Sequence, residues 1–148
     1  MKKSRIFYLI LFIPAAFLVF LIVCPAVNDM TAYSVSQTVW ETPLPPGTVK
    51  IEKASMAGKL VGSGNGMQYF GAILIKSDTS LDDLKKYYAE YSQNEWSYLV
   101  EEQSTKEVNE IEHGTLSFKT DPEEDGYYIV YSWGEGVKPF CEFDLRGH

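Results

Sequence analysis

The strongest constraint on this chain is a run of 22 residues without a charge, from position 6 to position 27. At about 1.5 Å per residue, a helix of this length reaches roughly 30 Å, the thickness of a bilayer's hydrocarbon core. The apolar part of a cleaved signal peptide is usually shorter, at about 7 to 15 residues. The sequence therefore predicts an uncleaved transmembrane anchor over residues 6 to 27.

The residues before this run predict its orientation. Lys2, Lys3 and Arg5 precede it, and basic residues beside a membrane segment generally stay in the cytoplasm. Residues 1 to 5 then form a cytoplasmic tip, and the chain after residue 27 lies outside. We expect a single-pass protein of the cell membrane with an extracytoplasmic C-terminal domain.

Two alternatives to an intact anchor stay open. Cys24 and Ala26 are small residues spaced as at a signal-peptide cleavage site, although Pro25 between them is unfavourable. Cleavage near Ala26 would give a secreted protein. Leu21 stands three residues before Cys24, as in a bacterial lipoprotein signal, but Val23 replaces the usual Gly or Ala, which argues against lipidation.

The charge of the outer part limits its partners. The chain has 13 basic and 20 acidic residues, and three of the basic ones lie in the cytoplasmic tip. The acidic outer part should repel nucleic acid and anionic headgroups, so we expect no nucleic acid partner. Basic proteins, cations and neutral surfaces fit better, although an acidic surface also serves solubility alone.

The two cysteines are far apart in the sequence. A disulfide between Cys24 and Cys141 would require the C-terminus to fold back to the bilayer. We therefore interpret Cys141 as a small, buried apolar residue.

Residues 28 to 47 are polar and proline-rich, with no apolar periodicity beyond Val35, Val39 and Trp40. They predict a tether about 25 Å long that holds a domain, residues 48 to 148, clear of the headgroups. At the start of the domain, residues 49 to 61 and 67 to 76 flank a glycine-rich turn, which is typical of a β-hairpin. Gly71, inside the second arm, indicates a bulge or a closely packed neighbour.

The remaining pattern predicts an α+β domain. Ser80 and Asp83 form a capping box for a helix with an apolar stripe, which ends near Gln93 and Asn94. Further strands are expected over residues 96 to 102, 115 to 120, 127 to 133 and 140 to 145. The order β-β-α-β-β-β predicts a small antiparallel sheet packed against one helix.

Three groups of residues are candidate sites, each with a simpler interpretation. Asp121, Glu123 and Asp125 resemble the start of a calcium loop, but Ser132 occupies the twelfth place, so an acidic turn is favoured and a weak cation site stays open. The glycine-rich turn is not one of the three, because it precedes a strand rather than a helix, and no nucleotide or other cofactor is expected.

His113 lies beside acidic residues, but no Gly-x-Ser-x-Gly nucleophile motif accompanies it. An envelope hydrolase or accessory enzyme that uses His113 is therefore the alternative, not the leading hypothesis. The third group is aromatic: Tyr87, Tyr88 and Tyr128 are candidates for a partly exposed recognition surface.

The segments 58 to 60, 62 to 66, 67 to 71 and 81 to 88 resemble small, signal-anchored extracytoplasmic proteins of Gram-positive bacteria that lack an assigned function. The resemblance covers residues 48 to about 100 and implies only location and an α+β domain. We expect a non-enzymatic, membrane-tethered domain that binds a protein or an envelope component. A structural subunit that props another membrane protein is a further hypothesis.

Overall fold

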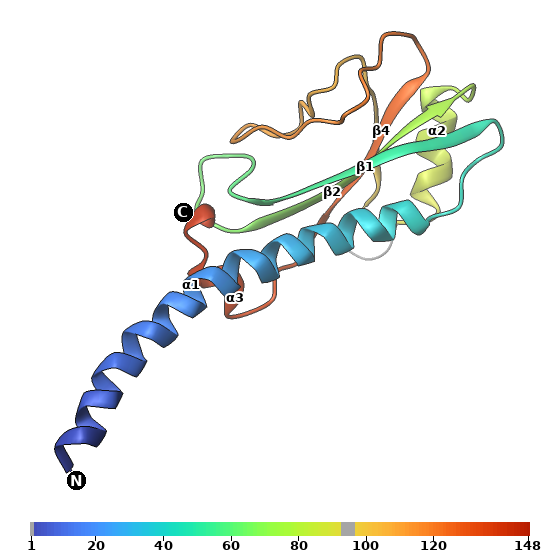
Figure 1. The fold of residues 1–148 in the computed structure, drawn as a ribbon. Helices are drawn as coiled ribbons and strands as arrows, with labels where there is room; N and C mark the ends of the chain where they lie inside the picture. The colour runs from blue at the N-terminus through green and yellow to red at the C-terminus, as the bar shows by residue number, and fades with distance from the viewer. Residues whose placement is uncertain (1, 93–96) are drawn as a thin grey trace.

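The computed structural model describes the backbone of residues 2 to 92 and 97 to 148 (Figure 1). The expected helix end at Gln93 and Asn94, and the expected strand start at Trp96, lie outside the described residues. The elements, in chain order, are α1 (Lys2–Glu41), β1 (Thr48–Gly58), β2 (Gln68–Ser77), α2 (Leu81–Ala89), β3 (Leu99–Glu102), β4 (Tyr127–Gly134), α3 (Phe140–Phe143) and the 3-10 helix η1 (Leu145–Gly147). The chain is therefore an α+β protein, as the sequence predicts.

The predicted tether over residues 28 to 47 is wrong, because α1 continues as one helix to Glu41. Its second half lies along the sheet, and only residues 42 to 47 connect it to β1 (Figure 1). The buried side chains recur every three or four positions, as one face of a helix requires. Most of them are small or polar rather than large and apolar: Cys24, Asn28, Ala32, Ser36 and Val39.

The four strands form one antiparallel sheet in the order β1-β2-β4-β3. The predicted hairpin is confirmed, with Thr48 opposite Ser77 and Gly58 opposite Gln68. Its turn is longer than expected, since β1 already ends at Gly58. Gln68 Oε1 closes this turn by accepting hydrogen bonds from the amides of Leu60 and Val61 at 2.7 and 2.8 Å.

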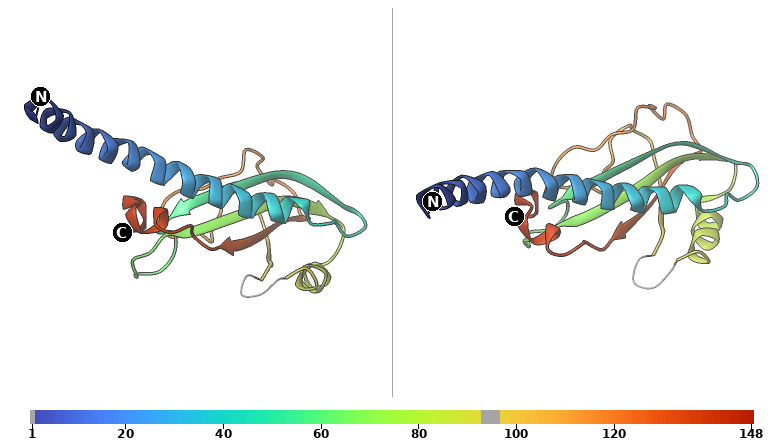
Figure 2. Two further views of the ribbon diagram at one scale, coloured as in Figure 1. Left: turned by 90° about the horizontal axis from the view of Figure 1, so that it is seen from below. Right: turned by 60° about the horizontal axis from the view of Figure 1, so that its bottom comes forward.

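The two faces of the sheet are covered by different parts of the chain (Figure 2). One face packs on α1 and α2 and buries Val39, Ile73, Ile75, Leu84, Tyr88, Val100 and Val130. The other packs on the cover segment, which we define as residues 103 to 120, and buries Phe70, Leu74, Val108, Ile111, Phe118 and Ile129. β2 is therefore a central strand covered on both sides.

The strand expected over residues 115 to 120 is not part of the sheet. Within the cover segment, a single bridge joins Glu107 to Ser117. The amide of Val108 donates to the carbonyl of Leu116 at 2.9 Å. Leu116 and Phe118, the apolar residues of the expected strand, instead pack on one face of the sheet.

The C-terminal strand expected over residues 140 to 145 is also wrong. This segment forms α3, which packs against α1, and η1, in which the Arg146 carbonyl accepts a hydrogen bond from the Lys59 amide at 2.8 Å. A half-buried strand would turn Phe143 and Leu145 inward and Asp144 outward, but Asp144 is 1% exposed, whereas Phe143 and Leu145 are 55% and 76% exposed. Asp144 is buried because it is paired with Arg146 and Asn28.

The predicted close neighbour of Gly71 is the backbone of α1. A Cβ atom at Gly71 would lie 2.2 Å from the amide nitrogen of Ser36 and 2.6 Å from the carbonyl carbon of Val35. A Cβ atom at Gly134, on the same face, would lie 2.3 Å from Val35 Cγ2. The helix and the sheet therefore approach each other closely, which explains the small residues on both surfaces.

Ser80 is the N-cap of α2, as predicted, but the Asp83 carboxylate bonds to the Ser80 hydroxyl rather than to its backbone amide. Ser80 Oγ accepts a hydrogen bond from the Asp83 amide and donates one to the Asp83 carboxylate, at 3.3 and 2.8 Å. Leu84 and Tyr88 are the buried residues of the predicted stripe. The capped helix packs over the end of the sheet that contains β3 (Figure 2).

Gly71→Ala should destabilise the domain by about 3 kcal/mol, because the added methyl group meets backbone that cannot rotate away. Gly64→Ala is the matched control, since a Cβ atom there has no neighbour within 4 Å. Thermal unfolding of the full chain in mild detergent measures both changes. Equal melting temperatures for the two variants would contradict the close contact.

Candidate functional site

An open groove of about 680 Å³ lies between α2 and β3. Helix α2 contributes Leu81 and Lys85, and the chain entering β3 contributes Tyr98. The groove is completed by the four residues of β3, Leu99, Val100, Glu101 and Glu102. It is the larger of two hollows that lie beside each other at this end of the sheet, since both include Glu102.

The groove runs beside a sheet edge with open hydrogen-bonding groups. β3 is the last strand of the sheet and pairs only with β4 in the part of the chain that the structure describes. The amide of Gln103, the next position in this register, donates to the Tyr127 carbonyl at 2.9 Å. Because bonded residues alternate in an antiparallel ladder, the N–H and C=O groups of Val100 and Glu102 point away from β4. Val100 is 2% exposed, so the accessible groups at this edge are those of Glu102.

The lining of the groove combines apolar surface with charge. Leu99 is 42% exposed, although it is a large apolar residue. Glu101 and Glu102 are exposed on one side and Lys85 on the other. Glu102 lies on the sheet face that α2 covers, whereas Leu99 and Glu101 lie on the opposite face, so the strand edge presents one carboxylate on each side.

Glu101 forms a pair of neighbouring carboxyl groups with Glu110. The Tyr131 hydroxyl donates to Glu101 Oε1 at 2.7 Å, and the Glu110 carboxyl group lies near that of Glu101. Burial first, and then the neighbouring Glu101 carboxylate, raise the pKa of Glu110 above its ordinary value. Glu110 Oε2 is buried and has no hydrogen-bond partner among the described residues.

The second hollow, of about 150 Å³, is acidic and contains two of the predicted site residues. Tyr128 and Asp125 line it, together with Glu102, Gln103, Ser104, Glu124, Gly126 and Tyr127. Tyr128 stands opposite Glu102 in the pairing of β3 with β4, so the two side chains lie on the same face of the sheet. The structure thus places Tyr128 next to the groove.

The other two predicted tyrosines are not equivalent. Tyr87 is half-buried, and a hydrogen bond with the Tyr91 hydroxyl at 3.2 Å, together with burial, raises the pKa of Tyr87 to about 12. Tyr88 is 0% exposed and packs in the core, where its hydroxyl has no partner among the described residues. A surface role for Tyr88 is therefore wrong, because α2 turns it toward the sheet.

The predicted acidic turn does not gather its carboxylates. Among the described residues, no group of three or more His, Cys, Asp or Glu side chains could hold a metal ion. Asp121, Glu123 and Asp125 are all exposed, and Glu124 between them forms an ion pair with Lys76 at 2.9 Å. The weak cation site considered from the sequence is therefore not formed by these three residues.

His113 holds the turn of the hairpin in place. Its Nε2–H donates to the Gly62 carbonyl at 2.9 Å, and Glu112 Oε2 accepts from the Gly62 amide at 2.8 Å. The His113 ring is exposed, and neither of the two hollows described above includes it. The contacts of His113 are those of a residue that fixes a loop.

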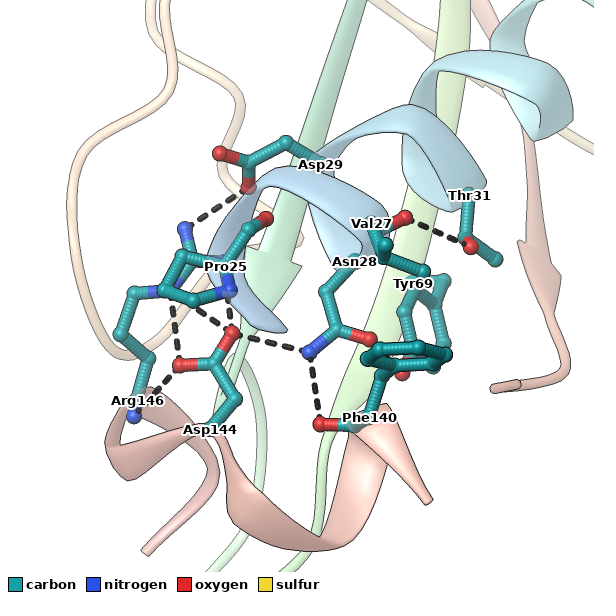
Figure 3. Close-up of polar contacts among 9 residues, drawn as sticks. All are labelled: Pro25, Val27, Asn28, Asp29, Thr31, Tyr69, Phe140, Asp144 and Arg146. Carbon is teal, nitrogen blue, oxygen red and sulfur yellow. Dashed lines mark hydrogen bonds and ion pairs between the residues drawn. The ribbon is translucent and has the colours of Figure 1, made fainter. Parts of the chain in front are cut away.

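A buried polar cluster, which sequence reasoning missed, joins α1 to the C-terminus (Figure 3). We call Asn28, Tyr69, Asp144 and Arg146 the C-terminal polar cluster. Asn28 Nδ2 donates to Asp144 Oδ2 and to the Phe140 carbonyl at 2.9 and 3.1 Å, and the Tyr69 hydroxyl donates to Asn28 Oδ1 at 2.7 Å. Arg146 Nη2 donates to Asp144 Oδ2 at 2.7 Å and to the Pro25 carbonyl at 3.0 Å.

This cluster brings the C-terminus back to α1, contrary to the sequence expectation. Arg146 also pairs with Asp29 at 2.7 Å. Cys24 is buried and Cys141 half-buried, and both are free thiols in the structure. Cys141 packs near Tyr69, in agreement with its predicted role as a small apolar residue. The signal that could have revealed the cluster is an asparagine on the same helix face as Cys24, Ala32 and Ser36.

Comparison of the chain with protein-family models, with curated proteins and with solved structures finds no match. The resemblance to signal-anchored Gram-positive proteins stays a prediction.

Glu110→Gln should raise the stability of the domain by about 1 kcal/mol at pH 7, because it removes a buried negative charge and can donate to Glu101. Because the pKa of Glu110 is raised in the folded state, Glu110 lowers the free energy of unfolding only when it is ionised. This destabilising contribution is absent at low pH and grows as the pH rises through the pKa of the folded state. The gain should therefore vanish near pH 4. Thermal unfolding at both pH values measures it. An equal gain in stability at pH 7 and pH 4 would contradict the ionised Glu110 carboxylate as its cause.

Asp144→Asn should lower stability at pH 7. Burial alone would raise the pKa of Asp144, but hydrogen bonds from Arg146 and Asn28 lower it to about 2. The Asp144 contribution is therefore complete above about pH 4 and is lost as the pH falls toward 2. The difference in unfolding free energy between wild type and Asp144→Asn should therefore become smaller as the pH falls from about 4 to about 2. Unfolding curves recorded across this pH range measure it. The exposed Asp121→Asn variant is the control and should follow wild type.

Proposed function

We propose that the chain is a single-pass membrane protein whose extracytoplasmic domain binds an extended segment of a partner protein along the β3 edge. The observation that carries the proposal is the open strand edge beside the groove between α2 and β3. An extended peptide can pair with such an edge as an additional strand, with main-chain hydrogen bonds supplying affinity and side-chain pockets supplying specificity.

The exposed first half of α1 supports the membrane anchor. Phe12, Phe17 and Ile22 are 69%, 59% and 73% exposed. The helix is long and apolar enough to cross a bilayer. Apolar side chains around an unaccompanied helix are expensive in water and favourable in lipid. The basic residues at its start favour an outer location for the domain.

The second half of α1 supports a fixed position for the groove. Residues 28 to 41 add about 20 Å of helix beyond the predicted span. Lys50, on β1, donates to the carbonyls of Trp40 and Thr42 at the end of this helix. Groove and anchor therefore belong to one rigid unit, so the groove is presented at a constant height above the membrane.

The chemistry of the groove specifies the class of partner. Glu102 and Glu101 favour basic side chains, one on each face of the sheet, and Leu99 favours an apolar residue on the face of Glu101. Side chains alternate between the two faces of an added strand. We therefore expect a partner segment with a basic residue on each face, an apolar residue beside one of them, and no strong negative charge.

The alternative, an envelope hydrolase that uses His113, has less support. His113 Nε2–H donates a hydrogen bond to the Gly62 carbonyl, and His113 lies outside both hollows. A nucleophile and base need a common concave site for substrate. The observed contacts favour binding over catalysis, and turnover by the full chain that is abolished by His113→Ala would reverse this preference.

A photo-crosslinking residue at Leu99 should capture a protein in intact cells, because this side chain is exposed at the open edge. The same residue at Ser63, an exposed position in the hairpin turn far from β3, is the matched control and should capture none of it. Mass spectrometry identifies the adduct in carbonate-washed membranes and checks that the N-terminus is intact. Introducing Glu101→Lys and Glu102→Lys should weaken the capture.

Equal capture at the two positions, or none at Leu99, would contradict the edge as the binding site. Loss of the chain from washed membranes, or an N-terminus near Asn28, would contradict the anchor instead.

A further inference from the structure

The C-terminal segment has an inverted polarity. In α3 and η1, Phe143 and Leu145 face outward at 55% and 76% exposure, whereas Asp144 between them is buried at 1%. A surface segment in water normally turns its apolar residues inward and its carboxylates outward. The reverse pattern is the one that suits a segment facing lipid.

Aromatic contacts place this segment against the predicted transmembrane part of α1. The Phe20 ring lies 5.5 Å from the Phe143 ring and 6.1 Å from the Phe140 ring, centroid to centroid. Figure 1 shows α3 beside α1, at the end of the sheet nearest the N-terminus. The C-terminal polar cluster fixes this arrangement one or two turns further along α1 (Figure 3).

The depth of Phe20 follows from the length of the helix. A span that starts at residue 6, just after Arg5, needs about 20 residues to cross roughly 30 Å of hydrocarbon, so it ends near residue 26. Phe20 then lies about 10 Å below the outer boundary. If the bilayer ended before Phe20, only residues 6 to 19 would remain, and they reach about 21 Å. That length is too short for a typical bilayer.

We propose that α3 and Leu145 lie in the outer leaflet of the membrane, with Phe143 and Leu145 in contact with lipid. The inference rests on the membrane anchor of the proposed function and deepens it, since it adds a second membrane contact. A depth of about 10 Å agrees with that of amphipathic segments at the boundary between headgroups and acyl chains. The exposed Lys138 and Glu142, an ion pair at 3.2 Å, lie at the headgroups.

Burial of Asp144 is what allows this position. Its carboxylate accepts hydrogen bonds from Asn28 and Arg146, so the charge is paired within the protein rather than exposed to lipid. Arg146 is in turn held by Asp29 and the Pro25 carbonyl. Two contacts with the membrane, α1 and the C-terminus, prevent the domain from rotating about the helix axis and so orient the groove.

Depth-dependent quenching of a fluorophore tests the proposal with the full chain in vesicles of phosphatidylcholine and phosphatidylglycerol. In a Cys24→Ala, Cys141→Ala background, Leu145→Cys carries an environment-sensitive label, and Phe143→Cys gives a second, independent reading. Leu145 is 76% exposed, so its replacement should not disturb packing, whereas Phe143→Cys also removes the Phe20 ring contact and is therefore the secondary reading. Glu90→Cys, at the exposed end of α2, is the control.

Lipids with a nitroxide in the outer part of the acyl chain should remove most of the fluorescence at positions 143 and 145 and leave position 90 unchanged. If the chain floats with the vesicles but positions 143 and 145 behave like position 90, the C-terminal contact is wrong and the anchor stands. If the chain does not float with the vesicles, both proposals are wrong.

Discussion

The close contact between α1 and β2 is the interaction on which the rest of the structure depends. At Gly71 the helix backbone occupies the space that a Cβ atom would fill, and Gly134 accommodates Val35 in the same way. This contact converts the second half of α1 into one layer of the domain. Because the same helix also contains the apolar span, that span and the helical layer on the sheet form one uninterrupted helix, with no tether between them.

Polar contacts hold both ends of this layer. Near the domain's far end, Lys50 donates to the last carbonyls of α1, and Lys53 lies 4.3 Å from the Tyr33 ring centroid. Next to the apolar span, Asn28 and Asp29 bind the C-terminal segment. The first and last parts of the chain thus meet at the predicted membrane surface, and the β3 edge lies at the opposite end of the sheet. This separation is what makes a groove beside β3 accessible to a partner.

The sequence predicted an element correctly where its residue pattern has a single local cause. The hairpin and the N-cap of α2 at Ser80 follow from local turn chemistry and capping. The second half of α1 was missed because its buried face is small and polar, since close packing on Gly71 excludes large residues. The C-terminal segment was misinterpreted because apolar residues at positions 141, 143 and 145 alternate as in a strand, while the buried group is Asp144.

The candidate site was predicted only in part, since it depends on tertiary pairing. Tyr128 lies beside the groove, whereas Tyr88 faces the core. No local pattern shows that β3 is an edge strand or that α2 lies beside it. Hydrogen exchange of the full chain in mild detergent tests the central claim most directly. The account predicts that the amides of residues 30 to 40 exchange as slowly as those of β2. Rapid exchange there, with β2 still protected, would show that this segment is a tether after all.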